Sequence, residues 1–275
     1  MHPIERLRFV ARASGADTNL LARETAGALA GFADDPAGLV MACRRIVARH
    51  PLSGPLWWLC SRVLVAPDPV AEAWRSADEL DADHTGRKLV DALPESSRLL
   101  AVGWSGPLQA ALGRRGDLTV LSSGCTTGSR LRSRADRWWD DDDDIDDPSA
   151  DAPTIEVTAE GLGGAAADAD VVALEAAAAG IAGFIAPAGS FAAAAVAHHE
   201  GRQVWMAAGV GRYLPPRVWE RVEHGLDAMG EPWERSFEVV PSALVSHVVG
   251  PAGLESPADA VRRTDCPVAP ELLRG

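Results

Sequence analysis

Two pairs of small residues, Ser105-Gly106 and Gly189-Ser190, stand where an apolar run of sequence gives way to a helical pattern. Backbone N–H groups at the start of a helix are unpaired and the helix dipole adds partial positive charge, so such a position suits a phosphate or another anion. Gly128, Arg130 and Arg212 fall near the same positions. The glycine would let a ligand approach the backbone closely, and the arginines would supply positive charge. Serine and glycine are also ordinary helix caps, so each pair alone is a weak signal. Together, these residues predict an anion-binding pocket.

Candidates for catalysis are few. Glu175 ends the apolar run DVVALE and would serve as a general base, or as the partner of an arginine or a backbone N–H. Cys125, in SSGCTTGSR, lies close to an expected helix start that would lower the pKa of its thiol. No histidine is placed by the sequence to activate that thiol. His198 and His199 follow a helix and precede a strand, so we expect them at the surface, away from the pocket. Catalysis is the less favoured interpretation.

The usual motifs of cofactor and metal sites do not occur in the sequence. Neither G-x-G-x-x-G nor a phosphate-binding P-loop is found, which disfavours a dinucleotide or a nucleoside triphosphate. The cysteines are widely spaced and form no C-x-x-C pair, which indicates neither a disulfide framework nor a structural zinc site: Cys43, Cys60, Cys125 and Cys266. We expect no cofactor and no metal.

The composition narrows the classes of protein further. The 275 residues are 47% hydrophobic, enough for one large domain or two small domains with real cores. The formal net charge of -13 argues against nucleic-acid binding, which needs a basic surface. No apolar run approaches the roughly 20 residues needed to span a bilayer, and the first residues lack the layout of a signal peptide. We expect a cytoplasmic protein with no membrane contact and no direct nucleic-acid binding.

Much of the negative charge lies in residues 138–153, WWDDDDDIDDPSADAP. A run of aspartates repels itself and is not buried unpaired, so an exposed loop is expected. A cation site is disfavoured because the glycine-punctuated spacing of a calcium loop is missing. Deleting residues 140–150 is expected to leave the melting temperature in calorimetry nearly unchanged. A large loss of stability would instead show that this stretch holds a metal or packs against a basic surface.

The elements that must position these residues divide the chain in two. Residues 1–94 show helical periodicity only, which predicts a helical domain. In DTNLLARETAGALAGF the expected buried face is Leu20, Leu21, Ala26, Leu29 and Ala30. Three further segments each begin with a capping residue and an early proline: DDPAGLVMACRRIVARH, SGPLWWLCSRVLVA and DPVAEAWRSADEL. Expected core residues are Leu39, Val40, Cys43, Ile46, Trp57 and Trp58.

In residues 95–275 short apolar runs alternate with helical stretches. The runs RLLAVGW, DLTVLSS, TIEVT, DVVALEA and QVWMAAG read as strands. This alternation predicts an α/β fold, with the helical domain followed by a doubly wound, mostly parallel Rossmann-like sheet domain. Such sheets bind ligands in the crevice at the carboxyl ends of their strands. We therefore expect one rim, formed by the loops at 103–106, 122–128, 175–190 and 208–212.

An ordered set of segments resembles the translation initiation factor 2B alpha/beta/delta family, which also includes methylthioribose-1-phosphate isomerase and ribose-1,5-bisphosphate isomerase. LEAAAAGIAGFIAPAGSFAAAAVAHHEGRQVWMAAG follows the family's succession of G-A-D-A, N-K-I-G-T, an alanine-rich helix and P-F-Y-V-A-A, with Gly189-Ser190 on G-T. LLAVGWSGPLQAAL, GSRLRS and FEVVPSALVSHVVGPAG resemble further segments. The resemblance covers roughly residues 97–262, and the helical first third is similar to the family's N-terminal domain.

The departures from the family pattern concern chemistry. The resemblance implies that the isomerases' aspartate falls on Ala176 and their cysteine near Gly103. The family's N-K becomes Ala186-Pro187, and its terminal T-E becomes Gly250-Pro251. Ring opening and proton transfer need a positioned acid and base, which alanine and glycine do not supply.

These observations favour a non-catalytic or regulatory protein, similar to the regulatory subunits of the initiation factor. It would bind a phosphorylated small molecule, a sugar phosphate or a nucleotide, and form a homodimer through the C-terminal domain, as the resemblance implies. A divergent sugar-phosphate isomerase of the aldose–ketose type is one alternative. A structural or interaction protein with a vestigial pocket is the other.

Overall fold

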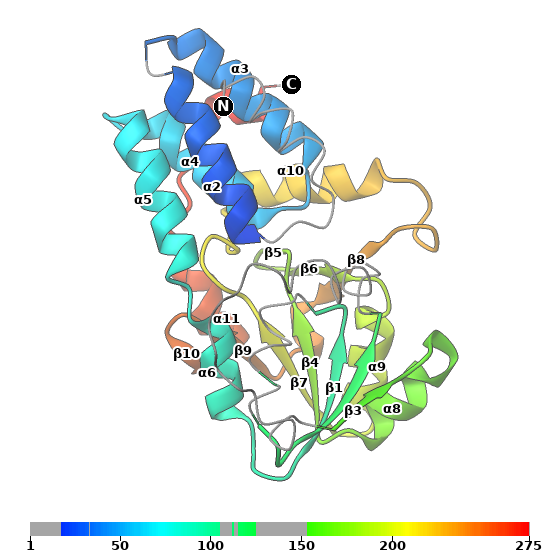
Figure 1. The fold of residues 1–275 in the computed structure, drawn as a ribbon. Coiled ribbons are helices and arrows are strands. Elements are labelled where there is room, and N and C mark those ends of the chain that lie inside the picture. Colours follow the sequence, from blue (N-terminus) through cyan, green and yellow to red (C-terminus); the bar gives the residue numbers. More distant parts are fainter. Residues whose placement is uncertain (1–17, 33, 105–111, 113–114, 125–152, 275) are drawn as a thin grey trace, which may run out of the picture.

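The computed structural model describes residues 18–32, 34–104, 112, 115–124 and 153–274 (Figure 1). Its first part is helical, as the sequence predicts: α2 (Thr18–Leu29), the 3-10 turn η1 (Ala30–Phe32), α3 (Pro36–Arg49), α4 (Gly54–Val65), α5 (Pro69–Asp81) and α6 (Thr85–Ala92). Among the described residues before position 98 there is no strand. Figure 1 shows α2 to α5 gathered at one end of the molecule, with the main sheet at the other.

Aspartates fix two of the helix starts. The Asp35 carboxylate accepts the Gly38 N–H at 2.9 Å, and that of Asp68 accepts the N–H groups of Val70 and Ala71 at 3.1 and 3.0 Å. Each bond satisfies a backbone donor that has no partner inside the helix. Ser53 also stands at a helix cap, but its side chain makes no capping hydrogen bond.

The buried faces agree with the expected ones except at their edges. Leu21, Ala26 and Leu29 of α2 are buried, whereas Leu20 is 46% exposed, because the face centres on residues 21, 22, 25, 26 and 29. In α3 the side chains of Leu39, Cys43 and Ile46 are buried and Val40 is half-buried. Trp57 and Trp58 both belong to the core, as predicted.

The main sheet has seven strands in the order β10-β9-β7-β4-β1-β2-β3. Their bounds are β1 (Arg98–Val102), β2 (Thr119–Ser123), β3 (Thr154–Glu156), β4 (Val171–Glu175), β7 (Gln203–Ala207), β9 (His247–Gly250) and β10 (Gly253–Glu255). All neighbours pair in parallel except β10, which runs antiparallel to β9. The central strands are apolar along almost their whole length, which is typical of a sheet covered on both faces.

Helices cover both faces of this sheet. On one face lie α8 (Leu162–Asp168), which follows the turn η3 (Ala159–Gly161), and α9 (Ser190–His199). Their small residues, such as Ala166 and Ala193, pack against Val172 and Leu174 of β4. On the other face α6 and Trp104 cover Leu99, Val171 and Trp205. The predicted α/β architecture is therefore confirmed.

A second sheet was not predicted. Residues 175–190 were expected to form a rim loop, but they contain β5 (Ala178–Ala179) and β6 (Gly183–Pro187). Together with β8 (Phe237–Pro241) these strands make an antiparallel sheet in the order β5-β6-β8. The expectation of a loop was wrong because β6 pairs with a strand some fifty residues away, and periodicity within one segment does not reveal such a partner.

The helical core also includes residues from the end of the chain. Residues of α10 (Pro216–Asp227) and α12 (Pro270–Leu273) belong to the same apolar cluster as α2 to α5. The Trp58 indole donates to Asp265 at 2.8 Å, and the Arg62 guanidinium lies 4.4 Å from the centre of the Trp58 ring. The remaining elements are η4 (Ser242–Leu244), α11 (Pro257–Ala260) and η5 (Val261–Arg263). Within the described ranges no helix is both long and apolar enough to span a bilayer.

Candidate functional site

Gly189 and Ser190 lie at the start of α9, next to the carboxyl end of β1. Gly189 is the helix cap and has a φ of 95°, a left-handed conformation that favours glycine. A Cβ at this position would lie 3.1 Å from Leu162 and 4.0 Å from Val102, the last residue of β1. Ser190 is completely buried, and its hydroxyl has no hydrogen-bond partner among the described residues. Buried polar groups almost always have a partner, so this hydroxyl calls for one that the described residues do not supply.

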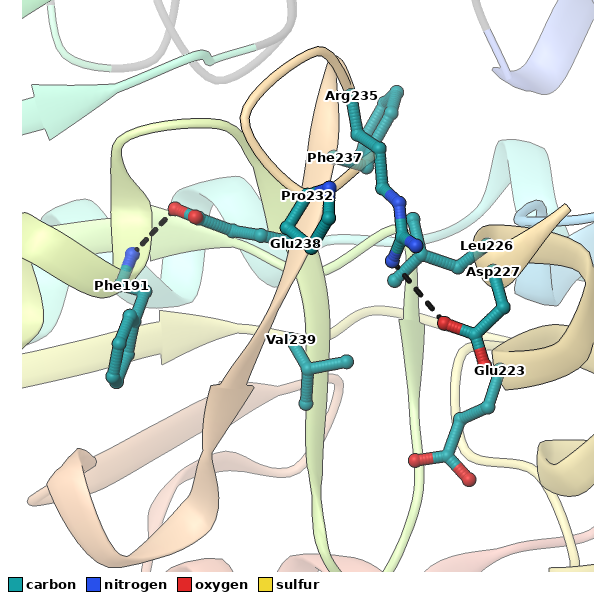
Figure 2. A pocket seen from close by; sticks show the side chains of 9 residues that line it. All are labelled: Phe191, Glu223, Leu226, Asp227, Pro232, Arg235, Phe237, Glu238 and Val239. Carbon is teal, nitrogen blue, oxygen red and sulfur yellow. Dashed lines mark hydrogen bonds and ion pairs between the residues drawn. The ribbon is translucent and has the colours of Figure 1, made fainter. Parts of the chain in front are cut away.

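One anion already occupies the first turn of α9. The Glu238 carboxylate, from β8, accepts the Phe191 N–H at 2.7 Å (Figure 2). A carboxylate at this position is stabilised by the positive end of the helix dipole. The sequence gives no local signal for this contact, because Glu238 lies 47 residues away from Phe191. A bound phosphate at the same helix start would experience the negative charge of Glu238.

Gly103 and Pro187 fill the space between β1 and β6. Gly103 follows β1 and has a φ of 64°. A Cβ on Gly103 would lie 2.4 Å from the Pro187 Cβ, far inside van der Waals contact. The two residues therefore fit only as a pair, and no side chain at position 103 fits beside Pro187.

Glu175 and Arg212 form an ion pair at the carboxyl end of β4. An Arg212 Nη lies 3.1 Å from a Glu175 carboxylate oxygen, and the guanidinium also donates to the Ala176 carbonyl. The side chains are only 16% and 12% exposed. The sequence left three roles open for Glu175: a general base, the partner of an arginine or the partner of a backbone N–H. The structure shows Glu175 as the partner of an arginine. The charge of Arg212 is thereby balanced within the protein.

The loop that carries Arg212 is held by the helical part of the chain. The Asp83 carboxylate accepts the Val210 N–H at 2.9 Å, and a Cβ on Gly209 would lie 2.0 Å from the same carboxylate. On the neighbouring loop, the Gly54 N–H donates to the Ala177 carbonyl at 2.9 Å. This half of the rim is therefore packed against the helices, whereas Gly189 and Ser190 lie in the other half, beside β1.

The described cysteines offer no nucleophile at the rim. Cys43, Cys60 and Cys266 are buried in the helical core. A hydrogen bond with Cys43 and burial raise the pKa of Cys60, and burial raises the pKa of Cys266 to about 12. High thiol pKa values disfavour the reactive thiolate. His198 and His199 are exposed in the last turn of α9, as expected.

Several of the predicted site residues lie outside the described residues: Ser105, Gly106, Cys125, Gly128, Arg130 and residues 138–152 of the acidic stretch 138–153. Among those described, Gly189 and Ser190 adjoin β1, and Arg212 joins Glu175. No contact within the described ranges links Arg212 to Ser190. In the same ranges no group of three or more histidine, cysteine or acidic side chains is placed to hold a metal ion.

Two cavities have linings that include neither Ser190 nor Arg212. One, of about 500 Å³, opens between α10, β8 and the start of α9, and Figure 2 shows its lining: Phe191, Glu223, Leu226, Asp227, Pro232, Arg235, Phe237, Glu238 and Val239. The other, of about 600 Å³, is lined by Asp91, Leu93, Pro94, Glu95, Ser96, Arg115 and Asp117. Sequence reasoning identified neither cavity, because their walls come from segments far apart in the chain.

Comparison with known proteins finds no matching family model and no matching curated protein. Solved structures do match. The translation initiation factor eIF-2B of Pyrococcus horikoshii is 13% identical, with a TM-score of 0.71 over 94% of this chain and 98% of that one. The tetrameric eIF2B-beta2-delta2 complex of C. thermophilum contains a chain that is 16% identical, with a TM-score of 0.71 over 94% and 92%.

The P. horikoshii 5-methylthioribose 1-phosphate isomerase is 14% identical, with a TM-score of 0.58 over 93% of this chain and 85% of that one. The helical first part and the parallel sheet, together with these matches, define the class of fold. It is the fold that eIF2B subunits share with this sugar-phosphate isomerase. The expected resemblance is confirmed at the level of the fold over nearly the whole chain.

Proposed function

We propose that this protein binds a phosphorylated small molecule, a sugar phosphate or a nucleotide, at the start of α9 without transforming it. One observation carries the proposal. The Ser190 hydroxyl is buried at a helix start, beside the carboxyl end of β1, and no described residue forms a hydrogen bond with it. A phosphate oxygen would satisfy that hydroxyl and accept backbone N–H groups of the same turn. Ser105-Gly106, Gly128 and Arg130 remain predicted contributors from neighbouring loops.

The rim chemistry supports binding over catalysis. Proton transfer between adjacent carbons needs a free acid and base, but Glu175 is paired with Arg212. At the positions that the resemblance assigns to the isomerases' cysteine and aspartate stand Gly103, which has no room for a side chain, and Ala176. We therefore propose a regulatory role rather than a divergent isomerase, in a cytoplasmic protein that forms a homodimer through its sheet domain.

Calorimetric titration tests this function. We expect ribose 5-phosphate and adenosine monophosphate to bind, and ribose and adenosine to give no heat of binding, because the phosphate makes the decisive contacts. If none of the four binds, the pocket is vestigial and the protein acts through its surface alone. If the uncharged compounds bind as well as the phosphates, the start of α9 is not the anion site.

Replacing Glu238 with glutamine is expected to tighten binding of ribose 5-phosphate by about two- to fivefold, the effect of one charge near a helix end. The amide oxygen can still accept the Phe191 N–H, while the negative charge that opposes the phosphate is removed. Glu223→Gln is the matched control, since Glu223 lines the same cavity but does not bond to α9. Equal affinities of the two variants would contradict a phosphate at the start of α9.

A further inference from the structure

The outer edge of β8 has backbone groups available for pairing. Within the described ranges, this strand is outermost in the order β5-β6-β8 and pairs with β6 alone. The Ala188 N–H donates to the Ser236 carbonyl and the Ser242 N–H to the Ala182 carbonyl, at 2.9 and 3.1 Å. The even-numbered residues of β8 therefore direct their backbone groups toward β6, because N–H and C=O groups alternate between the two edges of a strand.

It follows that Phe237 and Val239 direct their N–H and C=O groups away from β6. No described residue forms a hydrogen bond with either backbone. An edge of this kind is a template for another extended chain.

The 500 Å³ cavity runs along this edge. It is lined by Phe237, Glu238 and Val239 in succession. Since successive side chains of a strand point to opposite faces, a cavity that touches all three lies against the strand edge. Figure 2 shows β8 between Phe191 on one side and Leu226, Asp227 and Glu223 of α10 on the other. The edge is thus the floor of a groove, with Phe191 on one side and, on the other, Leu226 between the carboxylates of Glu223 and Asp227.

The groove carries an excess of negative charge. Among its described lining residues are the acids Glu223, Asp227 and Glu238 and one cation, Arg235. Arg235 is already engaged, because its guanidinium lies 3.2 Å from Asp227 and donates to the Gly230 carbonyl at 2.7 Å. A chain that enters the groove therefore meets carboxylates that favour basic side chains.

One apolar lining residue and two apolar side chains near the lining residues in sequence are exposed. Phe191 is 45% exposed, and Trp233, which follows the lining residue Pro232, is 80% exposed. Met229, just after α10, is 45% exposed.

We propose that the β8 edge groove binds an extended segment of another protein, with alternating apolar and basic residues. The segment would add a fourth strand next to β8 and pair with the backbones of Phe237 and Val239. Its apolar side chains would pack against Leu226 and Phe191, and its basic side chains would face Glu223 and Asp227. Main-chain pairing supplies affinity in this mode of recognition, and side-chain pockets supply specificity.

A second copy of this chain is a poorer occupant. Two antiparallel β8 strands would pair Phe237 of one copy with Val239 of the other in the register centred on Glu238, and this register places the two Glu238 residues directly opposite each other, where like charges are destabilising. The segment around β8 also carries Glu231, Glu234 and Glu238 against one arginine. A second copy would therefore place its own acidic side chains against an acidic groove.

Fluorescence anisotropy with an end-capped, labelled octapeptide of alternating valine and arginine tests the proposal on the full chain. We expect binding, and we expect N-methylation of the peptide residues on its β8-facing edge to weaken it by at least about tenfold, because two hydrogen bonds are lost. Amide hydrogen exchange should slow at Phe237 and Val239. A valine–glutamate octapeptide should not bind.

Variants of the protein locate the contact. Val239→Pro removes the outward N–H and is expected to weaken binding about fivefold, the equivalent of one hydrogen bond. Val239→Thr keeps that N–H and serves as the matched control. Glu223→Arg should also weaken binding. The proposal is overturned if no binding occurs or if the N-methylated peptide binds equally well. It is also overturned if Val239→Pro abolishes self-association in sedimentation, since the edge would then hold a second copy.

Discussion

Replacing Ser190 with aspartate is expected to weaken binding of ribose 5-phosphate by about a hundredfold or more. A charge-assisted hydrogen bond contributes about 1.5–3 kcal/mol, and this contact is replaced by repulsion between a fixed carboxylate and the phosphate. The site is buried, so the repulsion is poorly screened. Calorimetry gives the affinity, and a thermal melt of the same sample shows whether the variant is folded.

Ser190→Ala is the control that separates binding from folding. The Ser190 hydroxyl makes no hydrogen bond with the part of the chain that the structure describes, so its removal should leave the free energy of unfolding unchanged or slightly higher. Affinity for ribose 5-phosphate should nevertheless fall about tenfold. A variant that loses stability but keeps full affinity would mean that the hydroxyl serves the fold and not a ligand.

Arg212→Ala is expected to lower the free energy of unfolding by about 3 kcal/mol, since removing one partner of a buried ion pair leaves the other charge unpaired. The Ala176 carbonyl would lose a hydrogen bond as well. Urea denaturation measures the loss. The double variant Arg212→Ala, Glu175→Ala should lose less than the sum of the single variants, because the two side chains contact each other.

This prediction also decides which role Arg212 has. If Arg212→Ala keeps the stability of the protein but abolishes phosphate binding, the arginine belongs to the ligand rather than to Glu175. Arg212 would then supply the positive charge of the phosphate site. We expect instead that the start of α9 and the predicted Arg130 supply it.

Local features of this fold could be predicted from the sequence. Asp35 and Asp68 precede prolines and apolar periodicity, so two helix starts were readable from neighbouring residues. The central strands β1, β4 and β7 are mostly continuous apolar runs, and Gly189-Ser190 marks a helix start by residue type alone. Each of these signals lies within a few residues of the element that it predicts.

Features formed by distant segments could not be predicted in this way. The pairing of β6 with β8, the contact of Gly103 with Pro187 and the bond from Phe191 to Glu238 join residues far apart in the chain. Arg212 was readable as a cation, but its partner Glu175 lies 37 residues away. The sequence therefore indicated which residues suit an anion without showing which of them the protein already uses.

Phosphorus NMR of ribose 1,5-bisphosphate and 5-methylthioribose 1-phosphate, incubated with the protein, tests the central claim most directly. One spectrum reports both binding and turnover. We expect the phosphate resonances to broaden and shift as protein is added, with no new resonance on prolonged incubation. The resonance of a ketose phosphate would show an isomerase and contradict the account, and unchanged spectra for both compounds would contradict the proposed pocket.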